Sequence, residues 1–343
     1  MRTVAFSLFL MLAAVCAPAM GQSSPLEEKQ KAVLAFEIRM DLVRDSELGK
    51  SLGLAEMMSK VPGGDGEEMD MSGLESVLGA VSAPATMGDA MAVSMGGAPP
   101  EFFVQLKFKD NTMVDQMIAM AKKDNGGVVE RDGKTFYKPP SGGGGPDNMM
   151  MHSPKAGMLE MGTEAYLFQD TRQLMTDGLK SAWKASPKNE SIRIVMDMDG
   201  AKGLIAEAVE QAKASAPDPM VGEYLGLIDN MKDISISMNV ADGNLMSIFA
   251  NGVNSEDAEE LQGGLDSILG MAKMGGKMQV GQMQEFDPEG AKVLSQVLDS
   301  LNAKKDGDRV SVVIPKPDGF NPFLEKAVKQ AMAMMPPGLR PPE

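Results

Sequence analysis

The chain has 343 residues, of which 48 are acidic and 33 are basic, and its formal net charge is −15. An acidic surface of this kind repels phosphate backbones, so the composition argues against nucleic-acid binding. Aromatic residues make up only 5 % of the chain, which argues against a carbohydrate-binding surface built from exposed tryptophan and tyrosine. The length suits two domains or one large duplicated domain.

The first 21 residues have the pattern of a secretory signal peptide. Arg2 supplies the positive charge, residues 4–16 form an apolar run, and Ala19-Met20-Gly21 places small residues before an expected cut ahead of Gln22. The run is too short to cross a bilayer, which takes ~20 apolar residues. We therefore expect an exported protein, periplasmic or extracellular, with no transmembrane segment after cleavage.

Cys16 is the only cysteine, and it lies within the segment that would be removed. The mature chain would then have no disulfide, no thiolate nucleophile and no cysteine metal site. The alternative is a lipoprotein, in which Cys16 is retained and acylated. Val15 stands where such proteins usually have a small residue, so we favour removal of Cys16 over a lipid anchor.

Residues 22–190 are expected to form a first unit with two Gly- and Pro-rich insertions, an acidic one ending near Ser72 and a flexible loop over 139–154. Asp132-Gly133 between two short strand patterns is a strong hairpin signal. The hydrophobic patterns predict strands at 33–42, 90–95, 102–108, 128–131, 134–138 and 166–169. The patterns and capping residues predict helices after Ser46, over 74–81, after Asp110 through Lys123, and after Asp170 to about Trp183.

Residues 191–317 repeat this order and are expected to form a second unit. Asp242-Gly243 is again a hairpin signal. The strand at 191–198 could close the first unit or open the second. Residues 318–343 contribute an amphipathic helix over 320–335 and a Pro-rich tail. The patterns predict strands at 192–197, 234–240, 245–251 and 310–314, and helices over 200–214, from Ser255 through Lys273 and from Asp287-Pro288 to Leu301.

An internal duplication explains this repetition. Arg39-Met40-Asp41 and the helix after it match Asp197-Met198-Asp199 and its helix. The strand and capped helix over 102–123 likewise match residues 245–273. Runs of strands with one-sided helices predict the α+β class. We therefore expect two related units, each a mostly antiparallel sheet with helices packed on one face.

The strand leading into RMDLVRDSELGKSLG and the segment FANGVNSEDAEELQGGLDSILGMAK, together with the signal peptide, resemble secreted planctomycete-type proteins of unknown function. In those proteins an α+β unit is likewise repeated. The resemblance covers most of the mature chain and implies the duplicated fold. It implies no catalytic residue and no substrate.

Methionine is unusually frequent, with 33 residues in the chain. Thioethers are soft ligands that can bind Cu(I), which an exported protein could meet. A second cluster lies near the C-terminus, at Met332, Met334 and Met335. Most methionines stand where a pliable core filler is expected, and we favour that interpretation. The strongest candidate metal site combines the only histidine with its neighbours and consists of Met149, Met150, Met151 and His152.

Other patterns that carry chemistry are incomplete. Asp197-Met198-Asp199-Gly200 starts like a calcium loop but lacks the later ligands, so a helix cap is favoured. The acidic run over 65–70 is expected to be a solvated linker. A Ser-His-Asp triad could use only His152 as its base, and the glycine run over 142–145 lacks the lysine of a P-loop. Paired carboxylates could run hydrolysis, but nothing in the sequence marks a pair.

The sequence therefore favours an exported, non-catalytic binding or structural protein without a cofactor, whose partner is an unknown protein or envelope component. Its oligomeric state is left open. One alternative is a Met-rich protein that binds or buffers Cu(I). The other is a carboxylate-dependent hydrolase, which predicts a concave site with two facing acids, at least one of them with a raised pKa.

Overall fold

The structure is a computed structural model, and it describes residues 31–333 except 60, 63–67, 83–100, 124–126, 139–147, 169–173, 203–225 and 242. Helices and antiparallel strands make up the described chain, which confirms the predicted α+β class. Two compact units divide it. Unit 1 comprises residues 31–44 and 53–176, and unit 2 comprises residues 45–52 and 177–333. The expected signal peptide lies outside the described residues.

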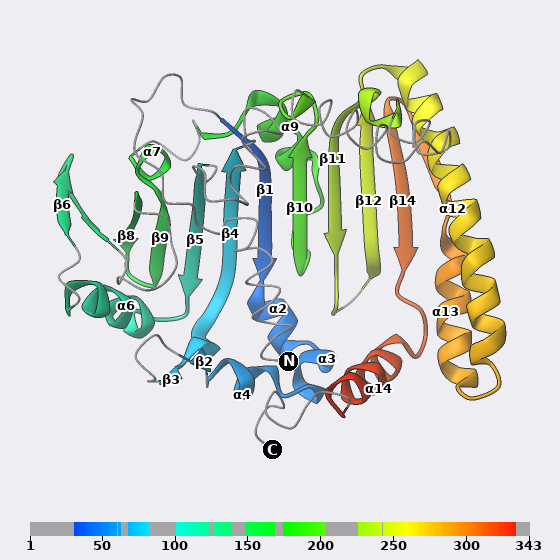
Figure 1. The fold of residues 1–343 in the computed structure, drawn as a ribbon, viewed down its shortest axis with the longest axis horizontal. Coiled ribbons are helices and arrows are strands. Elements are labelled where there is room, and N and C mark those ends of the chain that lie inside the picture. Colours follow the sequence, from blue (N-terminus) through cyan, green and yellow to red (C-terminus); the bar gives the residue numbers. More distant parts are fainter. Residues whose placement is uncertain are drawn as a thin grey trace, which may run out of the picture. The chain divides into compact units, whose positions relative to one another are not determined.

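Unit 1 is built on an antiparallel sheet with the strand order β1-β4-β5-β9-β8-β7-β6 (Figure 1). Asp132 and Gly133 both have positive φ, as a two-residue type I′ turn requires. They join β6 to β7, so the predicted hairpin is confirmed. The strands of this sheet are β1 (Ala32–Arg39), β4 (Leu74–Ser82), β5 (Phe102–Phe108), β6 (Val128–Arg131), β7 (Lys134–Tyr137), β8 (Met149–Lys155) and β9 (Met158–Thr163).

Short helices and one longer helix accompany this sheet. The longer helix is α6, and it begins where the Asp110 carboxylate accepts a hydrogen bond from the Thr112 amide at 2.9 Å. Its buried residues include Met113 and Val114. A separate two-stranded ribbon pairs β2 (Val61–Pro62) with β3 (Glu68–Met69). The helices are α2 (Met40–Asp45), α4 (Leu54–Met58), the 3₁₀ turn η1 (Met71–Gly73), α6 (Thr112–Lys123) and α7 (Glu164–Leu167).

Unit 2 has the antiparallel order β10-β11-β12-β14-β13. The strand that the sequence left undecided is β10, and it is the first strand of this unit, after α9. The strands are β10 (Ile192–Asp197), β11 (Met231–Met238), β12 (Asn244–Gly252), β13 (Ala303–Asp306) and β14 (Arg309–Pro315). The helices are α3 (Glu47–Ser51), α9 (Asp177–Ala185), α12 (Ser255–Met283), α13 (Pro288–Ser300) and α14 (Phe320–Ala333).

Helices cover both faces of the unit 2 sheet. Ala258 and Leu261 of α12 are buried in one cluster with Val310 of β14. On β10, the guanidinium of Arg193 stacks 3.7 Å from the ring centre of Trp183 in α9. The strand register and the alternation of side chains place Val310 and Arg193 on opposite faces. The α12 helix and the α9 helix therefore pack on opposite faces of the sheet.

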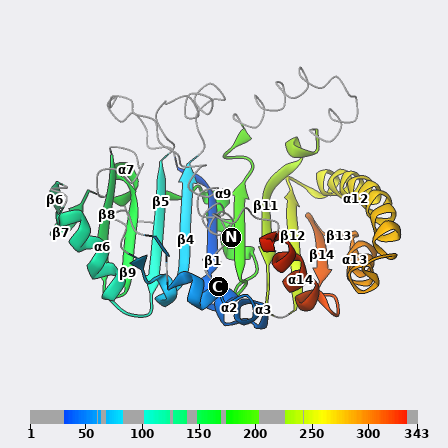
Figure 2. The same ribbon diagram turned by 60° about the horizontal axis from the view of Figure 1, so that its bottom comes forward.

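The amphipathic helix predicted near the C-terminus forms as α14, shown in red in Figure 2. It packs within its own unit. Lys326 forms an ion pair with Asp287 at 2.9 Å, and Asn321 Nδ2 donates to the Glu47 carboxylate at 3.3 Å. These contacts connect α14 to the N-terminus of α13 and to α3.

Several predicted elements were wrong in type or extent. Residues 74–81, predicted as a helix, form strand β4 because β1 and β5 pair with this segment on both sides. Residues 149–154, predicted as a loop, belong to β8, which pairs with β9. The segment predicted as a strand at 166–169 begins within helix α7. The cap of α12 is Asn254 rather than Ser255, and α12 continues past Lys273 to Met283.

Neither β9 nor β13 was predicted, because both are short segments between turns. The strand expected at 90–95 and the cap expected at Asp170 lie outside the described residues, as does most of the helix expected over 200–214.

The two units share one order of strand pairing. In unit 1 the order is β1-β4-β5-β9-β8, and in unit 2 it is β10-β11-β12-β14-β13. In each unit a helix follows the third strand, and a later hairpin, β8-β9 or β13-β14, pairs its second strand with that third strand; unit 1 has the additional hairpin β6-β7 after its helix. A duplication predicts this correspondence. The duplication itself, and the domain limits expected at 190 and 317, stay predictions.

Candidate functional site

The longest helices of unit 2, α12 and α13, lie side by side as a helical hairpin (Figure 1). Gly276 of α12 permits their close approach, because a Cβ at this position would lie 2.5 Å from a methyl carbon of Leu298. Asp287 caps α13 by accepting from the Gly290 amide at 3.2 Å, and Pro288 starts the helix, as predicted.

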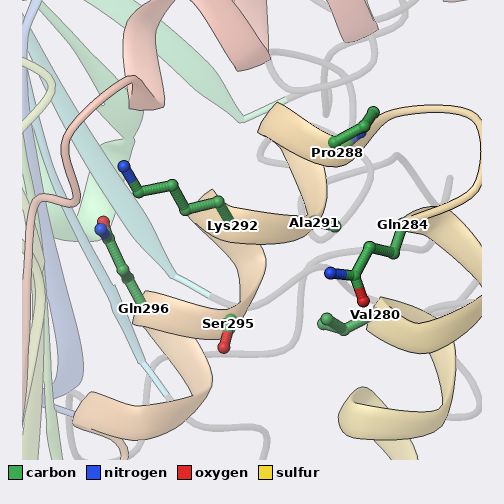
Figure 3. A pocket seen from close by; sticks show the side chains of 7 residues that line it. All are labelled: Val280, Gln284, Pro288, Ala291, Lys292, Ser295 and Gln296. Atoms are coloured by element: carbon green, nitrogen blue, oxygen red, sulfur yellow. The ribbon is translucent and has the colours of Figure 1, made fainter.

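A groove of about 330 Å³ runs between the two helices near their connection. In Figure 3, Val280 and Gln284 extend from α12 toward α13, whereas Lys292 and Gln296 extend from α13 away from α12. The groove therefore offers an aliphatic floor with amide and hydroxyl groups and no paired carboxylates. Its lining residues are Val280, Gln284, Pro288, Ala291, Lys292, Ser295 and Gln296.

The other side of α12 carries an exposed row of methionines. Met271, Met274 and Met278 follow at helical spacing, with 37 %, 68 % and 72 % of their surfaces exposed. Gly276, which faces α13, is two residues from both Met274 and Met278, or about 200° around a helix. Phe286, just after α12, is 76 % exposed. We call Met271, Met274, Met278 and Phe286 the α12 apolar surface.

The methionine part of this surface is basic within an acidic protein. Residues 267–284 contain Lys273 and Lys277 and no acidic residue, whereas Glu285 and Asp287 flank Phe286. Lys277 lies one helical turn from Met274, so its ammonium group borders the α12 apolar surface. A partner with apolar and acidic side chains would match both properties.

A row of polar side chains crosses the unit 2 sheet on the face that α9 covers. The strand register places Asp197 of β10 opposite Asp233 of β11, which in turn lies opposite Asn251 of β12. Asn251 Nδ2 donates to Asp233 Oδ1 at 2.6 Å. Arg309 of β14 follows next in the row. Asp197 and Asp233 are both buried, with 3 % and 6 % exposed.

Burial is the main cause of a raised pKa at Asp233, and the neighbouring Asp197 raises this pKa further. The hydrogen bond from Asn251 and the charges of Lys232 and Arg309 act in the opposite direction. Like charges directly opposite each other on paired strands repel. The arrangement therefore favours a protonated Asp233 carboxyl over a larger pH range than in an exposed aspartate.

Two facing acids with one raised pKa are what the hydrolase hypothesis predicts, but the position of the pair does not fit that role. Gly178 of α9 lies so close that a Cβ there would be 2.6 Å from Asp197 Oδ2. Asp197 Oδ1 also accepts from the Gly200 amide at 3.1 Å, as the predicted helix cap would. Both carboxyls are covered, so a substrate has no access to them in this conformation.

A second buried polar cluster lies in unit 1. The amide of Glu101 donates to Ser82 Oγ at 3.0 Å, and the Thr163 hydroxyl donates to the Glu101 carboxylate. Burial raises the pKa of Glu101. Burial likewise raises the pKa of Tyr166, whose phenol shares a hydrogen bond with Ser82. These contacts tie the end of β4 to the start of β5 and the end of β9.

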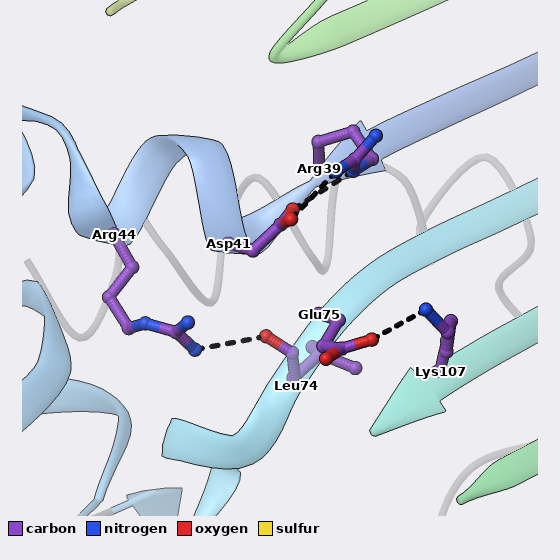
Figure 4. Close-up of polar contacts among 6 residues, drawn as sticks. All are labelled: Arg39, Asp41, Arg44, Leu74, Glu75 and Lys107. Atoms are coloured by element: carbon purple, nitrogen blue, oxygen red, sulfur yellow. Dashed lines mark hydrogen bonds and ion pairs between the residues drawn. The ribbon is translucent and has the colours of Figure 1, made fainter. Parts of the chain in front are cut away.

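Ion pairs and hydrogen bonds of charged side chains connect neighbouring segments near the end of β1 (Figure 4). Arg39 donates to both carboxylate oxygens of Asp41, at 2.9 and 2.7 Å, and this hydrogen bonding lowers the pKa of Asp41. Arg44 donates to the carbonyl of Leu74 at 3.2 Å. Lys107 and Glu75 pair across β5 and β4 at 2.6 Å. Each carboxylate here is neutralised by an adjacent cation.

The predicted metal cluster is divided by its strand. Because β8 alternates its side chains, Met150 and His152 lie on one face and Met149 and Met151 on the other. The structure therefore does not bring the four side chains together. Met150, Met151 and His152 are buried. Among the described residues, no group of three or more His, Cys, Asp or Glu side chains could hold a metal ion.

The other sequence candidates are only partly placed. The side chain of Met332 and the residues Met334 and Met335 lie outside the description, as does much of the acidic run over 65–70. In the part of the chain that is described, none of the helices combines the length and the apolar character needed to cross a membrane.

Sequence reasoning missed Asp233 and the α12 apolar surface. Asp233 stands near the start of β11 and Asp197 at the end of β10, so antiparallel pairing of these strands was the available signal. The α12 surface was missed because the helix was expected to end at Lys273.

Comparisons with known proteins give no functional assignment. No family model matches the chain, and no curated protein sequence matches it. Among solved structures, crystal form IV of TP0453 is similar with a TM-score of 0.38 and 7 % identity, over 87 % of this chain and 93 % of that chain. Crystal form III of TP0453 gives a TM-score of 0.37 and 8 % identity, over 90 % and 99 %.

The raised pKa of Asp233 predicts a specific pH dependence of stability. The Asp233 carboxyl binds its proton more tightly in the folded than in the unfolded state. Its contribution to the free energy of unfolding is therefore fully present below the unfolded pKa and is lost as the pH rises through the folded pKa. In Asp233→Asn the amide oxygen still accepts from Asn251 but does not titrate. We expect the Tm of the variant, relative to the native chain, to rise between pH 4.5 and pH 8.

The Tm is measured from thermal unfolding followed by the fluorescence of Trp183, the only tryptophan and a residue of unit 2. Asp229→Asn, at an exposed position of the same unit, is the matched control and should show no such trend. Equal pH trends for the two variants would contradict the assignment of the buried proton to Asp233.

Close packing of α9 over Asp197 predicts that Gly178→Ala is destabilising. The new methyl group would overlap the buried carboxylate, and such overpacking typically costs about 1–3 kcal/mol. The control is Gly270→Ala in α12, where no atom lies within 4 Å of the added Cβ. Alanine should there stabilise the helix by about 0.5–1 kcal/mol. Chemical denaturation measures both effects, and a stabilised Gly178→Ala would refute the close packing.

Proposed function

We propose that the mature protein is an exported, non-catalytic binding protein that contacts an acidic, apolar-rich segment of another protein through the α12 apolar surface. The observation that carries this proposal is the exposure of Met274, Met278 and Phe286, each more than two-thirds exposed. Clustered apolar exposure on a folded protein typically marks an interaction surface.

The chemistry of the surface supports a protein partner. Methionine is flexible and polarisable, so a row of methionines adapts to apolar side chains of varied shape. The row lies on the side of α12 that faces away from α13, so a partner can approach it without separating the hairpin.

The charges near α12 support an acidic partner segment. The chain as a whole has a net charge of −15, so most of its surface repels acidic proteins. Lys273 and Lys277 form no ion pair among the described residues, and both ammonium groups are therefore available to a carboxylate. Charge complementarity selects this surface over the remainder of the molecule.

Site-specific photo-crosslinking in the native envelope tests this surface. With a benzoylphenylalanine at position 274, we expect one dominant crosslinked protein, identified by mass spectrometry. Position 274 carries the photoreactive residue and cannot be varied further. The apolar contacts on either side of it are therefore removed by Met271→Gln with Met278→Gln. Lys273→Glu with Lys277→Glu reverses the local charge. Each pair should reduce the crosslink at least tenfold.

The matched charge control is Lys134→Glu with Lys188→Glu, at exposed lysines that belong to other elements than α12, and it should leave the crosslink unchanged. A second control places the photoreactive residue at Glu260, near the N-terminal end of the same helix. A crosslink that forms equally at position 260, or that survives both α12 variants, would refute the proposed contact.

Export predicts the N-terminus of the mature protein. Protein purified from the envelope of its own cells should begin at Gln22, and its intact mass should correspond to residues 22–343. Intact-mass spectrometry measures this directly. A chain that begins at Cys16 with the added mass of acyl groups would instead establish the lipid anchor, and a retained Met1 would refute export by cleavage.

A further inference from the structure

One ring nitrogen of His152, the only histidine, is fixed by a hydrogen bond to the backbone. This side chain on β8 is 7 % exposed, and its Nδ1 lies 3.2 Å from the carbonyl oxygen of Thr135. A carbonyl can only accept, so Nδ1 carries the proton and donates it there. In the neutral imidazole, Nε2 then carries a lone pair.

That lone pair is buried and has no hydrogen-bond partner among the described residues. A polar atom that loses its hydration without a new partner is costly, so each such atom in a folded protein calls for an explanation. A buried nitrogen lone pair without a hydrogen-bond donor could instead coordinate a metal cation.

The surroundings of His152 favour a soft, weakly hydrated cation. The Phe136 ring lies 4.9 Å from the imidazole, centre to centre, and Phe168 packs edge-on against Phe136. Such aromatic walls exclude water. Met150 is fully buried and stands two residues before His152 on β8, so strand alternation places its thioether on the same face as the imidazole.

A carboxylate on the neighbouring strand can balance a single positive charge. Glu160 of β9 is directly opposite His152 in the strand register, and it is held by a hydrogen bond from Gln105 Nε2 at 2.9 Å. A monovalent ion bound by two neutral ligands would thus have a counter-charge on the neighbouring strand.

We propose that His152 Nε2 and the Met150 sulfur bind one Cu(I) ion in unit 1. Histidine ligands commonly donate their other ring N–H to a backbone carbonyl, which is the contact made with Thr135. Imidazole and thioether are ligands that Cu(I) accepts. This site differs from the loop of four ligands expected from the sequence, because Met149 and Met151 face away from it. It is independent of the proposed contact at α12.

Competition with bicinchoninate under anaerobic, reducing conditions tests the site in the mature chain. We expect one Cu(I) per chain. His152→Gln and Met150→Leu should each weaken binding at least tenfold. Met149→Leu with Met151→Leu is the matched control, since it replaces two methionines on the opposite face of β8, one of them buried, and it should bind Cu(I) as the native chain does.

A measurement on the native chain makes the result independent of how the variants fold. The single histidine gives one pair of ring ¹⁵N resonances. One equivalent of Cu(I) should shift the Nε2 resonance strongly while Nδ1 remains protonated. An unchanged Nε2 resonance would overturn the proposal. So would equal loss of Cu(I) in the control variant and in Met150→Leu, which would indicate diffuse methionine buffering.

Discussion

In-register antiparallel pairing of neighbouring strands is the constraint on which the polar chemistry of this protein depends. It sets Asp197 against Asp233 and Asp233 against Asn251, and it sets His152 against Glu160. A slip of one residue would turn each of these side chains to the opposite face. In unit 2 that slip would turn the carboxyls away from α9 and toward the face on which α12 packs, and in unit 1 a slip of β8 would turn His152, together with Met150, away from Phe136.

Local signals in the sequence were sufficient for much of the fold. Capping residues such as Ser46 and Asp287 act through contacts within three residues, and both caps form as predicted. The Asp132-Gly133 hairpin likewise depends on the φ angles of two adjacent residues. The α+β class follows from the succession of such local elements, so it could be predicted without knowledge of which strands pair.

Elements determined by distant partners could not be predicted in this way. Residues 74–81 have apolar side chains at helical spacing, yet strands on both sides make the segment β4. The Met149 to His152 cluster has no periodicity of its own and becomes a strand through β9. The burial of Asp233 has the same origin, because its partners come from other strands and its cover from α9. Propensity says little where tertiary pairing decides the conformation.

Methionine shows why composition alone did not indicate a function. Met113 is buried on α6 as a core residue, Met150 is buried on the strand face of an imidazole nitrogen that has no partner among the described residues, and Met274 is mostly exposed. The same flexible thioether therefore fills space, offers a soft ligand or presents an adaptable contact, depending on its neighbours. The distinguishing property is what surrounds each sulfur. An acceptor nitrogen on the same strand face as Met150 points to a metal, and the two lysines near Met274, which form no ion pair among the described residues, point to an acidic partner, so the two proposals address different chemistries of one residue type.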